Sequence, residues 1–232
     1  MACILNIETS TKVCSLVLSV NENIVFEQAN FSGSSHASHL GVYAFQAIEY
    51  AKKNELTIDA VAVSSGPGSY TGLRIGISEA KGLCYGFGIP LIAIPTLKVM
   101  TSALLSVYHS SLANHYFCPM IDARRMEVYA SLYDTKLNEI RSVQADIIDE
   151  NSYKEYLDQQ SIIFFGDGSD KCKSVITSSN ALFVDNIHPL ATAMTGLAED
   201  AFSKKEFVDT AYFEPFYLKE FQATVAKNKV IC

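Results

Sequence analysis

An internal repeat is the feature that most constrains the fold of this 232-residue chain. Each half opens with a short apolar stretch that ends on a carboxylate, Cys3 to Glu8 in the first half and Met120 to Asp122 in the second. Each half then continues with strand-like alternation, a predicted helix, a further strand and a glycine-containing loop. Such a duplication predicts two similar α/β units with a cleft between them. Coincidence between two ordinary α/β units is the alternative explanation.

Local patterns give the bounds of the expected elements. In the first copy we predict strands at 3–8, 13–20, 24–28, 59–63 and 91–94, and helices at 39–53 and 71–86. In the second copy we predict strands at 120–122, 127–133, 139–143 and 162–165, and a helix at 150–160. Capping side chains for the first helix are offered by Ser34, Ser35, His36 and Ser38. We expect an N-terminal domain at 1–100 and a C-terminal domain at 101–232.

This layout resembles actin-like and sugar-kinase-like ATPases, the ASKHA or ribonuclease H-like fold, in which two hairpin turns hold the phosphates of a nucleotide. Backbone amides approach a phosphate closely where glycine removes the β-carbon, and neither turn of this chain contains glycine. Arginines crowd the second turn, although hydroxyls in the first could bind phosphate. We predict a vestigial nucleotide cleft, with no catalytic residue and no metal site, made of Glu8, Thr9, Ser10, Thr11, Asp122, Arg124, Gly166 and Asp167.

The glycine-rich segment GPGSYTGLRIG, from Gly66 to Gly76, opens the second predicted helix. It lacks the Lys-Ser/Thr pair of a Walker A loop. An anion cradle at a helix N-terminus is one explanation, and a tight strand-to-helix turn capped by Ser69 or Thr71 is the other. The loop residues singled out are Gly66, Pro67, Gly68, Ser69 and Thr71.

The two long helices of the first copy are apolar on more than one face. A helix that covers one side of a sheet needs a single apolar stripe, so the excess predicts an association surface. Burial by the second domain is the alternative. Gly72, Gly76 and Ala80 follow one helical face, where we expect another backbone to approach closely. On this interpretation, Gly76→Leu abolishes pairing and leaves the monomer folded.

Composition indicates which kinds of partner and which cellular compartment to expect. The chain has 18 Lys+Arg against 25 Asp+Glu, and its net charge of −7 disfavours an autonomous nucleic-acid binder. Six cysteines without a CxxC pair fit free thiols in a reducing cytosol: Cys3, Cys14, Cys84, Cys118, Cys172 and Cys232. We find no targeting segment and no apolar run of about 20 residues, so we expect a cytoplasmic protein with no membrane contact.

Two histidines raise a further possibility. His36 and His39 lie three residues apart at the start of the first helix, which could fit a metallopeptidase. No glutamate lies between them and no third ligand is evident, so we expect capping or exposed histidines instead.

Four motifs together resemble the TsaB (YeaZ) family, from the first strand to about Lys219. They are LNIETST at Leu5–Thr11, GPGSYTGLRIG at Gly66–Gly76, IDARRMEVY at Ile121–Tyr129 and EPFYLK at Glu214–Lys219. The resemblance implies a two-domain actin-like fold and a non-catalytic subunit of the machinery that makes threonylcarbamoyladenosine beside the anticodon of tRNA. Such proteins are also grouped with the M22 peptidases, and no residues here support peptidase activity.

The resemblance also implies the partners. The first two helices would pair with a second copy or with the catalytic paralogue TsaD, and the ATPase TsaE would dock on the heterodimer. The isolated chain would bind no cofactor, ATP and a metal ion would belong to the partner subunits, and tRNA would be reached only through the complex. The implied partner surface contains Tyr43, Ala47, Tyr50, Gly72, Arg74, Gly76, Ala80 and Leu83.

One alternative function stays open, an actin-like ATPase or small-molecule kinase that uses Glu8 or Asp122 to hold magnesium. Many relatives carry aspartate where this chain has Glu8, and the longer side chain makes a retained metal-nucleotide geometry less certain.

Overall fold

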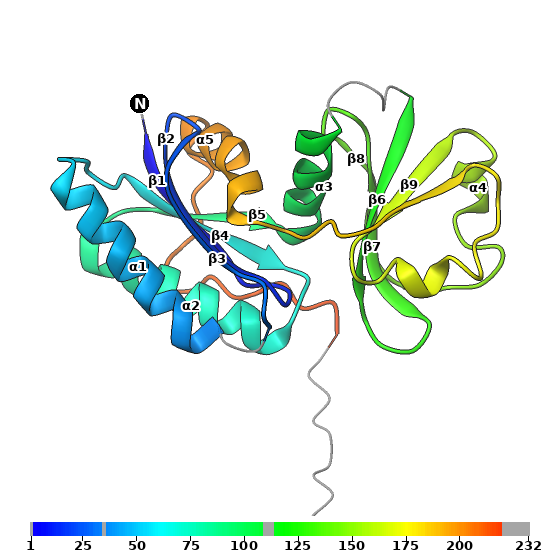
Figure 1. Ribbon diagram of the computed structural model, residues 1–232, viewed down its shortest axis with the longest axis horizontal. Helices are drawn as coiled ribbons and strands as arrows, with labels where there is room; N and C mark the ends of the chain where they lie inside the picture. Colours follow the sequence, from blue (N-terminus) through cyan, green and yellow to red (C-terminus); the bar gives the residue numbers. More distant parts are fainter. Residues whose placement is uncertain (1, 34–35, 109–113, 220–232) are drawn as a thin grey trace, which may run out of the picture.

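Each half of the chain builds one five-stranded mixed sheet in the computed structural model, which describes residues 2–33, 36–108 and 114–219 (Figure 1). The first sheet contains β1 (Cys3–Glu8), β2 (Cys14–Val20), β3 (Asn23–Asn30), β4 (Ala60–Gly66) and β5 (Leu91–Pro95). The second contains β6 (His115–Asp122), β7 (Glu127–Tyr133), β8 (Glu139–Ile147), β9 (Ser161–Phe165) and β10 (Ala181–Val184). The helices are α1 (His36–Lys53), α2 (Tyr70–Phe87), α3 (Thr96–Val107), α4 (Lys154–Leu157) and α5 (Thr195–Ser203), with 3₁₀ turns η1 (Asp170–Cys172) and η2 (Ala191–Met194).

The two sheets have the same topology. Their strand orders are β3-β2-β1-β4-β5 and, read in the same direction, β8-β7-β6-β9-β10. In each sheet the first three strands pair antiparallel and the last two join parallel to the central strand. Strand β6 therefore corresponds to β1, and every other strand has its counterpart. The predicted duplication is confirmed.

The second copy contains much less helix than the first. The predicted helix at 150–160 is wrong in length, since α4 contains only Lys154–Leu157. A turn in which Asp149 and Ser152 bond to each other and a left-handed Tyr153, at φ 62°, prevent an earlier helix start. After β9 the chain forms the short η1 where the first copy has α2. Long paired helices thus belong to the first copy alone, and α1 begins at His36, three residues before the predicted start.

Helix α3, which sequence patterns did not predict, contacts both sheets and lies between them in Figure 1. Its Val99 belongs to the apolar cluster of the first sheet, and its Leu97 and Met100 to that of the second. The domain boundary at residue 100 stays a prediction. Helix α5, beyond that boundary, packs on β1 and β5 of the first sheet.

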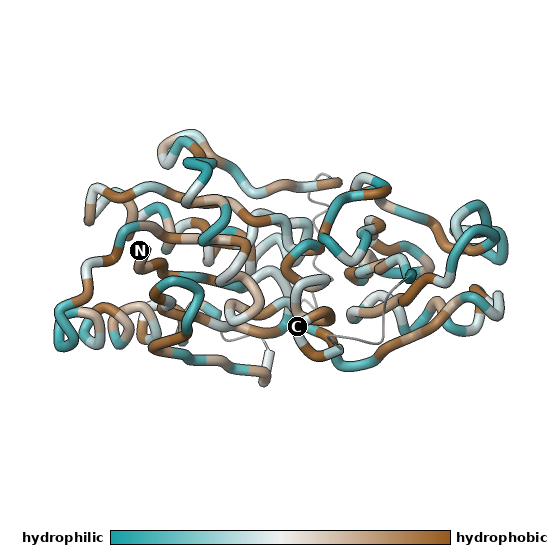
Figure 2. Tube along the Cα trace, turned by 90° about the horizontal axis from the view of Figure 1, so that it is seen from above, coloured by the Kyte–Doolittle hydropathy of each residue, from teal (hydrophilic) through white to brown (hydrophobic). Residues whose placement is uncertain are grey.

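Hydrophobic segments follow the strands of both sheets, and hydrophilic segments gather at the outer loops (Figure 2). Helices α1 and α2 cover one side of the first sheet, and α5 lies on the other side (Figure 1). Among the described helices, none has both the length and the apolar character needed to cross a bilayer. The predicted caps Ser34 and Ser35, Cys232 and the tail after Lys219 lie outside the described residues.

Candidate functional site

The first predicted phosphate turn is buried, and its polar groups bond within the chain. Glu8, Thr9 and Ser10 have no exposed surface. The Thr9 hydroxyl donates to the Gly72 carbonyl at 2.8 Å. The amide and the hydroxyl of Ser10 both donate to Glu8 Oε1, at 2.6 and 2.5 Å. Two of the three hydroxyls that sequence analysis offered to a phosphate are therefore used by the protein itself.

The glycine-rich loop packs directly on this turn. The Ser69 amide donates to the Ser10 carbonyl at 2.6 Å. A β-carbon at Gly68 would overlap the backbone of Ser10, and one at Gly72 or Gly76 would overlap Thr9. These glycines thus permit a close approach between α2 and the first turn of the same chain.

Of the two explanations for the loop, the capped turn is confirmed. Ser69 is the N-cap of α2, and its Oγ accepts from the Gly72 amide at 3.2 Å. The expected close approach of another backbone to the stripe of Gly72, Gly76 and Ala80 is met within the chain itself, since Gly72 packs on the Thr9 backbone. All three residues are buried against their own lobe, so they offer no surface to a partner.

Glu8 sits in an environment that favours its neutral form. Complete burial raises the pKa of the carboxyl above its ordinary value, and the hydrogen bonds from Ser10 only partly oppose this. Its Oε2 is buried and has no hydrogen-bond partner among the described residues. A carboxyl held in this way is a poor magnesium ligand.

We expect Glu8→Gln to change how stability depends on pH. Because the folded-state pKa lies above the unfolded one, the native state holds the extra proton, and Glu8 makes stability fall as pH rises from the unfolded pKa through the folded pKa. The neutral glutamine removes that loss, so the variant should gain stability over the wild type toward neutral pH. Urea denaturation at pH 4 to 8 measures this, with the exposed Glu150→Gln as control. A constant difference between Glu8→Gln and wild type would contradict the prediction.

The polar groups of the second turn also bond within the chain, through an ion pair and backbone amides. Asp122 Oδ1 forms an ion pair with Lys171 and accepts from the Arg124 amide at 3.0 Å. Asp167 Oδ1 accepts from the Asp122 amide at 3.1 Å. Arg124 and Arg125 are exposed and have positive φ, 71° and 47°. A magnesium ion at Asp122 would have to compete with the Lys171 ammonium.

The cavity beside the first turn is small. A cavity of about 60 Å³ is lined by Thr11, Lys12, Met100, Asp167, Ile187, His188 and Pro189. Pockets for small ligands typically measure about 300 to 1,000 Å³. Within the described ranges, no three His, Cys, Asp or Glu side chains cluster as a metal site would require. With both carboxyls engaged, these residues do not fit a nucleotide and its metal.

The two histidines bond within the chain. His36 is buried, and its Nε2 donates to the Thr11 carbonyl at 2.8 Å. His39 Nε2 lies 3.2 Å from Asn30 Nδ2, and its ring contacts Tyr43. The expectation of an exposed or capping histidine is wrong for His36, because its ring fastens α1 to the first turn.

The eight residues predicted for the partner surface do not lie on one exposed face. Tyr43, Ala47, Gly72, Gly76 and Ala80 are buried, and Tyr50 and Leu83 are half-buried against the core of the first sheet. Arg74 is exposed, but its guanidinium lies 4.2 Å from the Tyr70 ring centroid and its Nε donates to the Tyr217 hydroxyl at 3.3 Å.

The exposed face of the two helices is made of other residues, which we call the helix face. Val42 and Phe45 on α1 are 52% and 64% exposed, and Tyr85 and Phe87 on α2 are 89% and 48% exposed. On α2, small residues are exposed at every fourth position: Ser78, Gly82 and Gly86. A β-carbon on either glycine would meet nothing within 4 Å.

The residues that the family resemblance implied for the partner surface lie mostly on the sides of the helices that pack on the sheet, so they did not include the helix face. The signal was the i, i+3 pair Val42 and Phe45, which lies off the buried stripe of Leu40, Ala44 and Ala47. The alternative that the second domain covers the excess apolar residues is wrong, since the side chains of the helix face are exposed to solvent.

The C-terminal motif joins the other motifs in space. The Phe216 amide donates to the Ser65 carbonyl at 2.7 Å, beside the glycine-rich loop. Tyr217 packs on Tyr70 with ring centroids 4.8 Å apart. Lys219 Nζ lies 2.5 Å from Glu127 Oε1, in the second-half motif. Residues from both halves are thus connected through one segment.

Comparisons with known proteins agree with this architecture. The family model described as "TsaD: tRNA N6-adenosine threonylcarbamoyltransferase" matches residues 20–227. The chain is 28% identical to the tRNA threonylcarbamoyladenosine biosynthesis protein TsaB of Escherichia coli over 223 residues, 93% of this chain and 94% of that one. It is 27% identical to the TsaB of Bacillus subtilis over 146 residues, 62% of this chain and 60% of that one.

The fold has a solved counterpart. YeaZ from Pseudomonas aeruginosa superposes with a TM-score of 0.79 at 22% identity, covering 94% of this chain and all of that one. The predicted α/β actin-like fold is therefore confirmed. The family model spans most of the sequence, and the relatives that align along nearly its full length are named as biosynthesis proteins of one tRNA modification. This chain belongs to the TsaB (YeaZ) family.

Proposed function

We propose that this chain is a non-catalytic scaffold of the cytoplasmic machinery that installs threonylcarbamoyl on adenosine beside the anticodon of tRNA. It acts by pairing its helix face with a TsaD-type transferase. The observation that carries this proposal is the exposed helix face, apolar and lined by small residues, on a chain whose two turns bond to its own groups.

The helix face has the chemistry of a protein interface. Aromatic residues dominate interface energetics, and Phe45 and Tyr85 expose most of their side chains. Small residues at Gly82 and Gly86 let a facing helix approach closely, because interhelical distance depends on the side chains at the contact. Two helices from each partner would form a four-helix bundle, and a second copy of the chain is the expected partner in isolation.

The net charge of the chain and the state of its two turns indicate which tasks the partner proteins perform. A net charge of −7 disfavours direct contact with the tRNA backbone, so the partner makes most tRNA contacts. Nucleotide and metal belong to the partner subunits, including a TsaE-type ATPase on the heterodimer, because Glu8 is buried and Asp122 is paired with Lys171 here. Calorimetric titration of the isolated chain with ATP and magnesium is expected to show no heat of binding.

Reconstitution tests the scaffold role. A TsaD-type transferase, a TsaE-type ATPase, threonylcarbamoyl adenylate and unmodified tRNA are combined with and without this chain, and modified adenosine is measured by mass spectrometry of nucleosides. We expect modification to fall to background without the chain. Undiminished modification in its absence would refute the proposal.

A further inference from the structure

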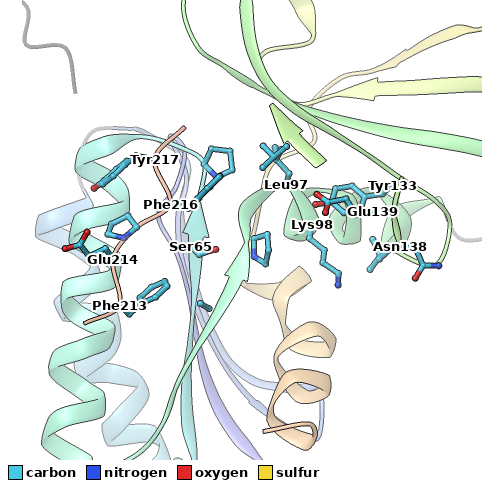
Figure 3. A pocket seen from close by; sticks show the side chains of 17 residues that line it. Ser65, Leu97, Lys98, Tyr133, Asn138, Glu139, Phe213, Glu214, Phe216 and Tyr217 are labelled. Carbon is cyan, nitrogen blue, oxygen red and sulfur yellow. The ribbon is translucent and has the colours of Figure 1, made fainter. Parts of the chain in front are cut away.

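A cavity of about 920 Å³ opens between the two lobes, and neither of the two turns contributes to its wall. It lies at the carboxyl ends of the parallel strands β4 and β5, which is where open α/β sheets bind ligands. The first turn of α3, the β7–β8 hairpin and the C-terminal segment complete it (Figure 3). Its size is that of pockets that enclose small molecules.

The walls are mostly apolar and come from both lobes. Phe213 and Phe216 lie on one side, and Leu97 and Tyr133 lie on the other (Figure 3). Prolines, Ala93 and Val143 add further apolar surface. Such walls suit the flat or branched apolar body of a ligand, since burying that body removes its surface from water.

The polar groups favour an anionic end on that ligand. Lys98 is half-buried in the first turn of α3, and no described carboxylate lies within ion-pair distance of its ammonium. Helix α3 has no side-chain cap and no acidic residue in its first turn, so its positive end reinforces Lys98. Two carboxylates, Glu139 and Glu214, also line the cavity; both are exposed, so water weakens their charge more than that of the half-buried Lys98.

We propose that this cavity binds a small amphipathic carboxylate, with its aromatic or branched apolar body between the two aromatic-lined walls and its carboxylate at Lys98. The inference goes beyond the scaffold role and stands on different residues. Its occupant touches both lobes and the segment that joins them, so binding also holds the lobes together.

Calorimetry with two matched probes, 1-naphthoate and 1-naphthylmethanol, tests the site on the full chain. Naphthoate should bind at least about tenfold more tightly than the uncharged alcohol, since charge-assisted hydrogen bonds exceed neutral ones by that margin. Lys98→Gln should abolish this preference while Lys204→Gln, at the exposed C-cap of α5 and outside the cavity, preserves it. Ala93→Phe, which fills the cavity from β5, should abolish binding of both probes.

Three results would overturn the proposal. They are absence of naphthoate binding to wild type at millimolar concentration, equal affinity for the two probes, and unchanged affinity in Ala93→Phe. Val143→Phe fills the cavity from β8 and replaces Ala93→Phe if that variant fails to fold. Unfolding midpoints in urea, measured without probe, identify a variant that has lost its structure.

Discussion

Phe45→Asp is expected to weaken association with a TsaD-type transferase at least about a hundredfold and to leave the monomer folded. Its side chain is 64% exposed on α1, so the free chain loses little buried surface on substitution. In a pair, the aspartate would place a charge in the apolar centre of the helix face. Anchors at the centre of an interface typically contribute about 2 to 4 kcal/mol, and 1.4 kcal/mol corresponds to a tenfold change in affinity.

The matched control for this variant is Ile147→Asp. Ile147 is 78% exposed on β8, far from the helix face in the fold, and the change in charge is the same. Calorimetry of each variant with the purified transferase gives the affinities, and urea denaturation shows that the monomers remain folded. Equal affinities for wild type and Phe45→Asp would show that the two proteins pair through another surface.

Gly76→Leu is expected to unfold the first lobe, and Gly82→Ala on the same helix is expected to stabilise it. Any β-carbon at Gly76 overlaps the Thr9 side chain, and the first turn beneath is held by the backbone hydrogen bond from Ser69 to Ser10. Overpacking of this kind costs about 1 to 3 kcal/mol for a small group, and leucine adds three more carbons. Gly82 has open space around it, so alanine there gains about 0.5 to 1 kcal/mol of helix propensity.

Urea denaturation followed by circular dichroism distinguishes the two glycines. The midpoint should fall for Gly76→Ala, fall further or vanish for Gly76→Leu, and rise for Gly82→Ala. This replaces the sequence-based expectation that Gly76→Leu disrupts pairing alone, since any loss of pairing would follow from unfolding. A Gly76→Leu chain as stable as the wild type would contradict the packing described above.

The residue types of the two turns predict some properties of the vestigial cleft and not others. The absence of glycine in both turns predicts that neither is built to approach a phosphate closely, and in the structure both turns bond to groups of their own chain. What occupies the turns was not predictable, because Ser69 and Lys171 are distant in sequence from the groups they bond, Ser10 and Asp122. Contacts of that range depend on how the sheets and loops pack, not on local pattern.

Sequence alone determined the duplication, the order of elements along each half and the excess of apolar residues on two helices, because side-chain periodicity and turn residues are local properties. Only the tertiary structure decided which side of each helix is free. The stripe of Gly72, Gly76 and Ala80 and the stripe of Ser78, Gly82 and Gly86 have the same spacing on α2. The first turns toward Thr9 and the second toward solvent, since α2 must bury one side against the turn and sheet of its own lobe, and that choice fixes the surface left for a partner.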